Sequence, residues 1–103
     1  MAQFIKVATT AEVPNNQGKV VDIGGQQVAV FNVNGEFCAI NNICPHRGGP
    51  LGEGDLEGSV VTCPWHAWQY SLASGALVQD PGVGVTTHET RIVGDEVQVR
   101  LTE

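Results

Sequence analysis

The sequence has few basic residues, few cysteines and no long hydrophobic run. Its 103 residues include five lysines and arginines against 11 aspartates and glutamates, which gives a formal net charge of −6. So few cations argue against a nucleic-acid backbone or an anionic membrane as the partner, because both are themselves negatively charged. A basic protein surface is the partner that this charge favours. No apolar segment reaches the roughly 18 residues that a membrane-spanning helix needs.

The N-terminal segment MAQFIKVATTAEVP lacks the apolar stretch and the basic flank of a secretion signal, so we expect a cytoplasmic protein. Three cysteines is an odd number, and in a reducing compartment a disulfide framework is a poor explanation for them. Metal or redox chemistry explains them better. The hydrophobic fraction of 42% excludes intrinsic disorder, and the length predicts a single domain over residues 1–103.

The sequence contains no internal repeat, no linker and no helical pattern longer than one turn, whereas glycine is frequent, with 13 residues. Short runs rich in Val, Ile and Phe lie between Gly, Asn and Pro residues, which is typical of strands in an all-β protein. The pairs Gly24-Gly25 and Asn34-Gly35 predict two-residue hairpin turns. Many short strands at close spacing predict a small antiparallel sandwich or barrel. The expected strands are 4–7, 19–23, 26–33, 36–40, 59–62, 68–71 and 97–101, with one helical turn at 9–12.

Two stretches interrupt the strand pattern and contain most of the unusual residues. The first, 43–58, includes Cys44-Pro45-His46, and the second, 63–68, includes Cys63-Pro64-Trp65-His66. Each begins just after an expected strand and is therefore expected to be a loop that caps a hairpin. Two thiolates and two imidazoles suit an iron–sulfur cluster or zinc, but not calcium or magnesium. Common zinc sites pair Cys with Cys and His with His, so the mixed pairs favour the cluster.

The two motifs, with their flanking Pro, Gly and Trp residues, resemble those of the Rieske-type [2Fe–2S] ferredoxins of bacterial ring-hydroxylating oxygenases. The resemblance covers essentially the whole chain. It implies an all-β Rieske fold, an antiparallel sandwich or barrel with a small cluster-binding subdomain formed by the two loops. It also implies that Cys44 and Cys63 bind one iron of the cluster, and that His46 and His66 bind the other.

By the same resemblance, the protein is a monomeric electron carrier and not an enzyme, with no catalytic residue of its own. It would take one electron from a flavin- and NAD(P)H-dependent reductase and pass it to a terminal oxygenase, either a dioxygenase or a monooxygenase, in aromatic hydrocarbon catabolism. The chain has no flavin or nicotinamide motif and no room for a catalytic iron domain. Two alternatives stay open: a small Rieske-like subunit of an assimilatory nitrite reductase, and a zinc-stapled binding module with no redox role.

The resemblance also bears on the reduction potential. High-potential Rieske proteins carry an additional disulfide between the two loops, where this chain has Gly49 and Trp65, and a serine where it has Trp68. A tyrosine that donates toward a ligand cysteine is retained as Tyr70. Because the disulfide and the serine are missing, we expect a potential near the low end of the Rieske range, around −150 mV.

Three features lie outside the two ligand pairs. Cys38 falls within an expected strand, and we expect it to be a small buried hydrophobe. His88 lies in the polar stretch 86–91 and is expected at the surface. The acidic residues Glu53, Asp55 and Glu57 neighbour the first ligand pair, where they either steer a basic docking surface or only keep the loop soluble.

Overall fold

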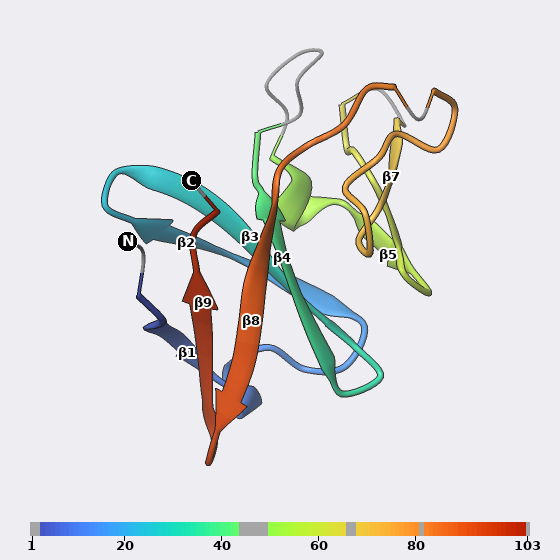
Figure 1. The fold of residues 1–103 in the computed structure, drawn as a ribbon. Helices are drawn as coiled ribbons and strands as arrows, with labels where there is room; N and C mark the ends of the chain where they lie inside the picture. The colour runs from blue at the N-terminus through green and yellow to red at the C-terminus, as the bar shows by residue number, and fades with distance from the viewer. Residues whose placement is uncertain (1–2, 44–49, 66–67, 81, 103) are drawn as a thin grey trace.

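The computed structural model describes residues 3–43, 50–65, 68–80 and 82–102, which form two antiparallel sheets (Figure 1). The larger sheet is barrel-like and nearly closed. Its strands, in order across the sheet, are β1 (Ile5–Thr9), β9 (Glu96–Arg100), β8 (Thr87–Val93), β4 (Glu36–Asn41), β3 (Gln26–Val33) and β2 (Gln17–Ile23). The smaller sheet consists of β5 (Asp55–Glu57), β6 (Val60–Thr62) and β7 (Gln69–Ser71).

The helical content is limited to two single 3-10 turns among the described residues. The first, η1 (Thr10–Glu12), follows β1, and the second, η2 (Leu51–Glu53), precedes β5. The prediction of an all-β protein with one helical turn near residues 9–12 is therefore confirmed. In the part of the chain that the structure describes, no helix is long and apolar enough to cross a membrane.

The hairpins of the larger sheet form where the turn signals predict them. Strands β2 and β3 pair from Gln17↔Asn32 to Ile23↔Gln26, around the Gly24-Gly25 turn. Between β3 and β4, Asn34 and Gly35 have φ angles of 53° and 91°. A type I′ turn needs positive φ at both central residues, and Asn and Gly tolerate this conformation best.

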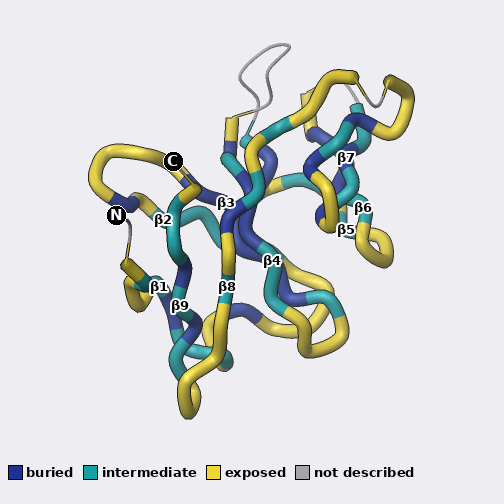
Figure 2. The backbone as a smooth tube through the Cα atoms, in the orientation of Figure 1, coloured by how far each residue is buried: buried dark blue, intermediate teal, exposed yellow. Residues whose placement is uncertain are grey.

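Strand β3 is buried on both faces and joins two hydrophobic cores (Figure 2). Because side chains alternate along a strand, Val28 and Val30 enter one core while Ala29 and Phe31 enter the other. We call the first the barrel core; its buried residues are Ala8, Val13, Ile23, Val28, Val30, Ala39, Val97 and Val99. The second, the junction core, links the two sheets and consists of Ala29, Phe31, Ile40, Leu51, Val61, Cys63, Tyr70, Leu72 and Leu77.

Two strands differ from expectation. The stretch 43–58 is not a loop throughout, because it contains η2 and β5. Strand β5 has the sequence Asp-Leu-Glu, and one apolar residue is too short a pattern to indicate a strand. Strand β8 begins with the polar run Thr87-His88-Glu89-Thr90-Arg91. This run gives no sequence signal that the segment is a strand paired with β4 and β9.

The expectation that His88 lies at the surface is wrong, since only 7% of the residue is exposed. Its Nε2 atom lies 2.8 Å from Oδ1 of Asn41, and its Nδ1 accepts a hydrogen bond from the N–H of Thr102 at 3.0 Å. An imidazole that accepts at Nδ1 carries its proton on Nε2 and is neutral. Burial lowers the pKa of His88, which is consistent with that neutral form.

Cys38 is half-buried rather than fully buried, and its side chain packs against the junction core. Burial raises the pKa of its thiol, and the nearby carboxylate of Glu36 raises it further. A thiol with a raised pKa is a poor nucleophile and a poor metal ligand. The structure therefore supports a packing role for Cys38.

Candidate metal centre

One of the four predicted ligands, Cys63, lies among the described residues. The other three, Cys44, His46 and His66, lie outside them. Within residues 3–43, 50–65, 68–80 and 82–102, no group of three or more His, Cys, Asp or Glu side chains is arranged to hold a metal ion. The site can therefore be described through Cys63 and through the residues at the bases of the two loops.

Cys63 directly follows β6 and is buried in the junction core, with 1% of the residue exposed. Its N–H donates a hydrogen bond of 2.7 Å to the carbonyl of Trp68. This bond extends the β6–β7 ladder by one step beyond the Thr62↔Gln69 pair. The segment 63–68 thus caps the β6–β7 hairpin, as the sequence predicts.

The first loop is closed at its base by backbone contacts. Ile43 and Pro50 form an antiparallel bridge, and the N–H of Leu51 donates to the carbonyl of Asn42 at 2.7 Å. Leu51 is fully buried, whereas Ile43 is 48% exposed. The chain therefore leaves β4 and returns to η2 at neighbouring points, one on the surface and one in the core.

The bases of the two loops lie next to each other. Strand β5, which follows the first loop, pairs with β6 through Asp55↔Thr62, one residue before Cys63. A Cβ atom on Gly54 would overlap the carbonyl oxygen of Thr62, so only glycine allows this approach. Leu51 and Cys63 then meet in the junction core.

This arrangement fits a cluster held between two loops. Cys63 supplies a buried sulfur at the base of one loop, and the adjacent loop carries Cys44 and His46 in its sequence. Thiolate and imidazole donors are the set expected for a [2Fe–2S] centre that uses two histidines. The surrounding apolar side chains of the junction core limit water access on the inner side, one of the factors that tune such a centre.

A third segment, which contains Leu77 and Val78, runs beside β7. The N–H of Val78 donates a hydrogen bond of 2.8 Å to the carbonyl of Gln69. The N–H of Leu77 donates one of the same length to the carbonyl of Val83. Large apolar side chains are exposed on or beside the three connecting segments: Ile43, Trp65, Val78 and Val83. Other large apolar residues that are exposed, Ile5, Ile92 and Val93, lie on β1 and β8.

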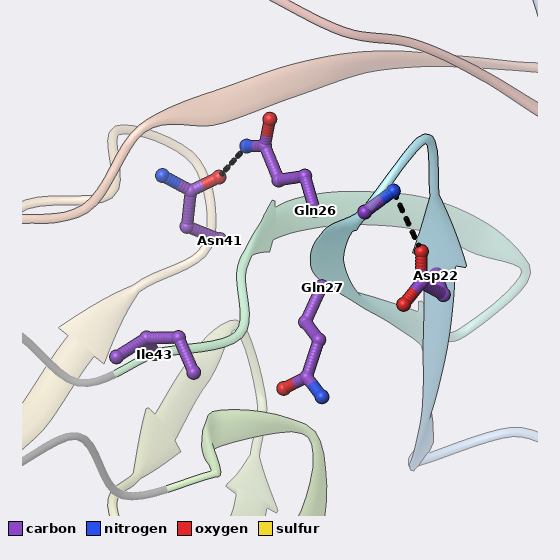
Figure 3. Close-up of a pocket in the computed structure, with 6 residues that line it drawn as sticks. Asp22, Gln26, Gln27, Asn41 and Ile43 are labelled. Carbon is purple, nitrogen blue, oxygen red and sulfur yellow. Dashed lines mark hydrogen bonds between the residues drawn. The ribbon is translucent and has the colours of Figure 1, made fainter.

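A groove of about 570 Å³ lies beside the first loop (Figure 3). It is lined by Asp22, Gly25, Gln26, Gln27, Asn41 and Ile43. Gln26 Nε2 donates to Asn41 Oδ1 at 2.7 Å, and the N–H of Gly25 donates to Asp22 Oδ1 at 2.9 Å. These bonds stabilise the β2–β3 turn and the end of β4. Among the residues that the structure describes, the lining includes Ile43 at the base of the first loop but not Cys63.

Sequence reasoning missed Asn42, which is 2% exposed, lies just before the first loop and is bonded to β3 and to the residues that follow the loop. The available signal was weak: an Asn pair between an apolar strand and Cys44. Asparagine at a strand end usually indicates only a turn. Its bonding partners become visible once η2 is placed against β4.

Comparison with known proteins places these features in a family. Residues 3–91 match the family model described as the Rieske [2Fe-2S] domain. The 3-phenylpropionate/cinnamic acid dioxygenase ferredoxin subunit of Escherichia coli (strain K12) is 34% identical over 101 residues, which cover 96% of this chain and 94% of that protein. Human apoptosis-inducing factor 3 is 33% identical over 98 residues, but the match covers 94% of this chain and 16% of that protein.

Solved structures agree with this assignment. A ferredoxin chain from the complex of reduced oxygenase and oxidised ferredoxin in carbazole 1,9a-dioxygenase has a TM-score of 0.86 and 27% identity, over 94% of this chain and 92% of that chain. A putative NADH-dependent nitrite reductase small subunit from Mycobacterium tuberculosis has a TM-score of 0.91 over 100% of this chain and 98% of that chain. At 22% identity, this likeness concerns the fold alone. On the match over residues 3–91 and the ferredoxin relatives, this chain belongs to the Rieske [2Fe-2S] domain family.

Proposed function

We propose that this protein carries single electrons from a reductase to a terminal oxygenase by means of one Rieske [2Fe–2S] cluster. The observation that carries this proposal is the end-to-end match to a dioxygenase ferredoxin subunit, 96% of this chain against 94% of that protein. The protein matched in this way is the ferredoxin subunit of a dioxygenase system. The protein is therefore the carrier component and not the enzyme.

Cys44 and Cys63 are proposed to hold one iron, and His46 and His66 the other. When bound, the cluster supplies reversible one-electron redox chemistry, and two neutral imidazoles in place of two thiolates make its reduction easier. The chain's own contribution is to fix Cys63 at the end of a paired strand and to hold both loop bases against the junction core.

The partner of this site is proposed to contact the exposed apolar side chains of Ile43, Trp65, Val78 and Val83. The relative in the carbazole 1,9a-dioxygenase system is described in complex with its oxygenase. A net charge of −6 favours a basic surface around the apolar contact. Dependence on an NAD(P)H-linked reductase also makes a cytoplasmic location part of this proposal.

The proposal is tested by measuring iron, zinc and acid-labile sulfide per chain on protein purified without oxygen. We expect two irons and two sulfides per chain, and reduction of the cluster by a flavin reductase with NAD(P)H. Zinc without sulfide, persisting after reconstitution with iron and sulfide, would favour the zinc-stapled module and overturn the carrier function.

The nitrite reductase alternative has weaker support, because the resemblance to such a subunit is confined to the fold. A carrier exchanges electrons as a separate protein, whereas a subunit works within a stable complex. Multiple-turnover reduction of a terminal oxygenase by substoichiometric amounts of this protein is expected. Activity only at one-to-one stoichiometry with a nitrite reductase would favour the alternative.

The reduction potential gives an independent prediction. Without the disulfide and the serine hydroxyl of high-potential relatives, we expect a value near the low end of the Rieske range, around −150 mV. Tyr70 is fully buried in the same core as Cys63, so the remaining tyrosine is close to the candidate site. A redox titration monitored by visible absorption checks this value, and a positive potential contradicts it.

A further inference from the structure

Asn42 lies at the base of the first loop, two residues before Cys44, and only 2% of it is exposed. Its backbone N–H donates to the carbonyl of Gln27 at 3.1 Å, and its carbonyl accepts from the N–H of Leu51 at 2.7 Å. Its side-chain Oδ1 accepts from the N–H of Gly52 at 2.7 Å, and Nδ2 donates to Gln27 Oε1 at 3.1 Å. Asn42 thus bonds to β3 and to η2 at the same time.

These contacts join the two ends of the first loop. Asn42 precedes the segment 44–49, whereas Leu51 and Gly52 follow it. Among the described residues, the Ile43↔Pro50 bridge also joins the two ends, and it is more exposed to solvent, since Ile43 is 48% exposed. A buried backbone N–H that loses its acceptor bears the full cost of its desolvation, so the bond from Gly52 to Asn42 stabilises the position of η2 against the end of β4.

The fit between Asn42 and Gly52 is tight. A Cβ atom on Gly52 would lie 3.0 Å from Asn42 Oδ1 and would overlap Cγ2 of Val20. The lack of a side chain at this position lets the η2 backbone reach the asparagine amide. The Asn42 side chain thus adds a second buried contact to the backbone bond between Asn42 and Leu51, and this contact requires that residue 52 has no side chain.

We propose that Asn42 is a positioning residue for the predicted iron ligand Cys44. By fixing the separation of the loop ends, it sets the geometry in which that ligand meets the cluster. It acts through the backbone of η2 and of its own strand end. This inference rests on the proposed function, because it needs a cluster at the site, and it adds a residue to that site.

The test compares two buried asparagines of the same protein. Asn32 is a matched control: it is 8% exposed, its Nδ2 donates to the carbonyl of Val13 and its Oδ1 accepts from the N–H of Gly35, both at 2.8 Å. It lies at the opposite end of β3 from Gln27. Asn42→Ala and Asn32→Ala each remove two side-chain hydrogen bonds, so both are expected to lower the unfolding midpoint.

Three properties of the cluster are expected to distinguish Asn42→Ala from Asn32→Ala. In Asn42→Ala we expect shifted electron paramagnetic resonance g-values of the reduced cluster and a shifted reduction potential. We also expect iron to be released about tenfold faster, as is usual when the support of a metal ligand is removed. In Asn32→Ala we expect these three properties to match those of the wild type.

A second pair of variants disturbs the contact between Asn42 and Gly52 without changing Asn42. In Val20→Ala/Gly52→Ala, the alanine at 52 presses on Asn42 Oδ1, while the shortened side chain at 20 removes the larger overlap. Val20→Ala alone is the control. We expect the double variant to shift the g-values and the potential relative to that control.

Equal shifts in Asn42→Ala and Asn32→Ala, or no shift in Asn42→Ala, would overturn the proposal. If Asn42→Ala does not fold, the pair at Val20 and Gly52 decides by the same criterion: a shift supports the proposal and its absence overturns it. Wild-type protein that contains iron and sulfide while all variants keep its spectrum would refute only the role of Asn42. Wild-type protein without iron and sulfide refutes the proposed function itself.

Discussion

At the scale of single residues, the two described cysteines have different surroundings. Cys63 directly follows the paired strand β6, at the base of a loop. Cys38 lies within β4, and its side chain packs against the junction core. Only the first lies next to the loop that carries Cys44. We therefore expect that the cluster depends on the thiol of Cys63 and not on the thiol of Cys38.

Serine variants test this separation. Cys38→Ser is expected to keep two irons and two sulfides per chain and to lose about 1 kcal/mol of stability, because a half-buried sulfur is replaced by a hydroxyl. Cys63→Ser is expected to lose the cluster, since a neutral hydroxyl is a poor replacement for a thiolate ligand. Metal and sulfide analysis of both variants checks the prediction, and cluster loss in Cys38→Ser contradicts it.

His88 gives the protein a pH-dependent stability. Burial lowers its folded pKa below the unfolded value near 6.5, so the unfolded chain binds the proton more readily. Its contribution is present above about pH 6.5 and is lost as the pH falls through the folded pKa. Protonation at Nδ1 would also place an N–H against the N–H of Thr102.

Urea unfolding of the wild type and His88→Gln at pH 8 and at pH 5.5 checks this expectation. The variant loses the bond from Thr102 and should be about 1 kcal/mol less stable at pH 8. The difference between the two proteins should shrink at pH 5.5, because only the wild type bears the cost of protonation. A difference that stays constant with pH contradicts the role assigned to His88.

At the scale of elements, the approach of β5 to β6 depends on Gly54. A side chain there would collide with the Thr62 carbonyl and push apart the strands that bring the two loop bases together. We expect Gly54→Ala to cost about 1–3 kcal/mol, as overpacking usually does, and to lower the iron content per chain.

Gly58 in the β5–β6 turn provides the control for this variant. It has a φ of 60° and open space around its Cα atom, so Gly58→Ala adds backbone strain without a collision. It should cost about 1 kcal/mol and leave the iron content unchanged. Equal iron content in the two variants would show that the approach at Gly54 is not needed for the site.

The elements that could be predicted from the sequence are those with local signals. Strand β3 and its two turns follow from apolar residues between Gly24-Gly25 and Asn34-Gly35. Strands β5 and β8 could not be predicted, because their pairing depends on partners distant in sequence and their own residues are mostly polar. The burial of His88 has the same origin, since Asn41 lies 47 residues away along the chain.

The candidate site follows the same division. The Cys–His spacing and the family resemblance predicted the ligands Cys44, His46, Cys63 and His66, of which the structure places Cys63. The roles of all four as ligands stay predictions. The support from Asn42 and Gly54 could not be predicted, because a single buried hydrogen bond or close approach leaves no pattern in the sequence.

At the scale of the whole molecule, the acidic side chains lie at different places relative to the candidate site. Glu53 lies on η2, just after the first loop, and Asp55 pairs with Thr62, one residue before Cys63. Glu36 begins β4, at the end opposite the first loop, and Asp95 lies in the β8–β9 turn (Figure 1). An acidic protein that meets a basic partner associates more slowly as salt screens the attraction. The position of each charge decides how much it contributes.

Stopped-flow reduction of the oxygenase at increasing ionic strength tests this expectation. We expect the wild-type rate to fall as the Debye length shortens to about 8 Å near physiological salt. Glu53→Gln/Asp55→Asn should weaken that dependence, whereas Glu36→Gln/Asp95→Asn removes as much charge and should change it less. The same slope in both double variants would mean that only the net charge matters.

The pairing of β1 with β9 has a consequence for how this domain is used. Ile5 lies opposite Val99, so the polypeptide enters and leaves at neighbouring points of the larger sheet, on the side away from β7 (Figure 1). Polypeptide attached at either end would therefore join the domain on one side of the larger sheet. The same unit is therefore suited to gene fusion, in which a tether replaces diffusion by a high effective concentration. Its match to 16% of human apoptosis-inducing factor 3 is consistent with such modular reuse.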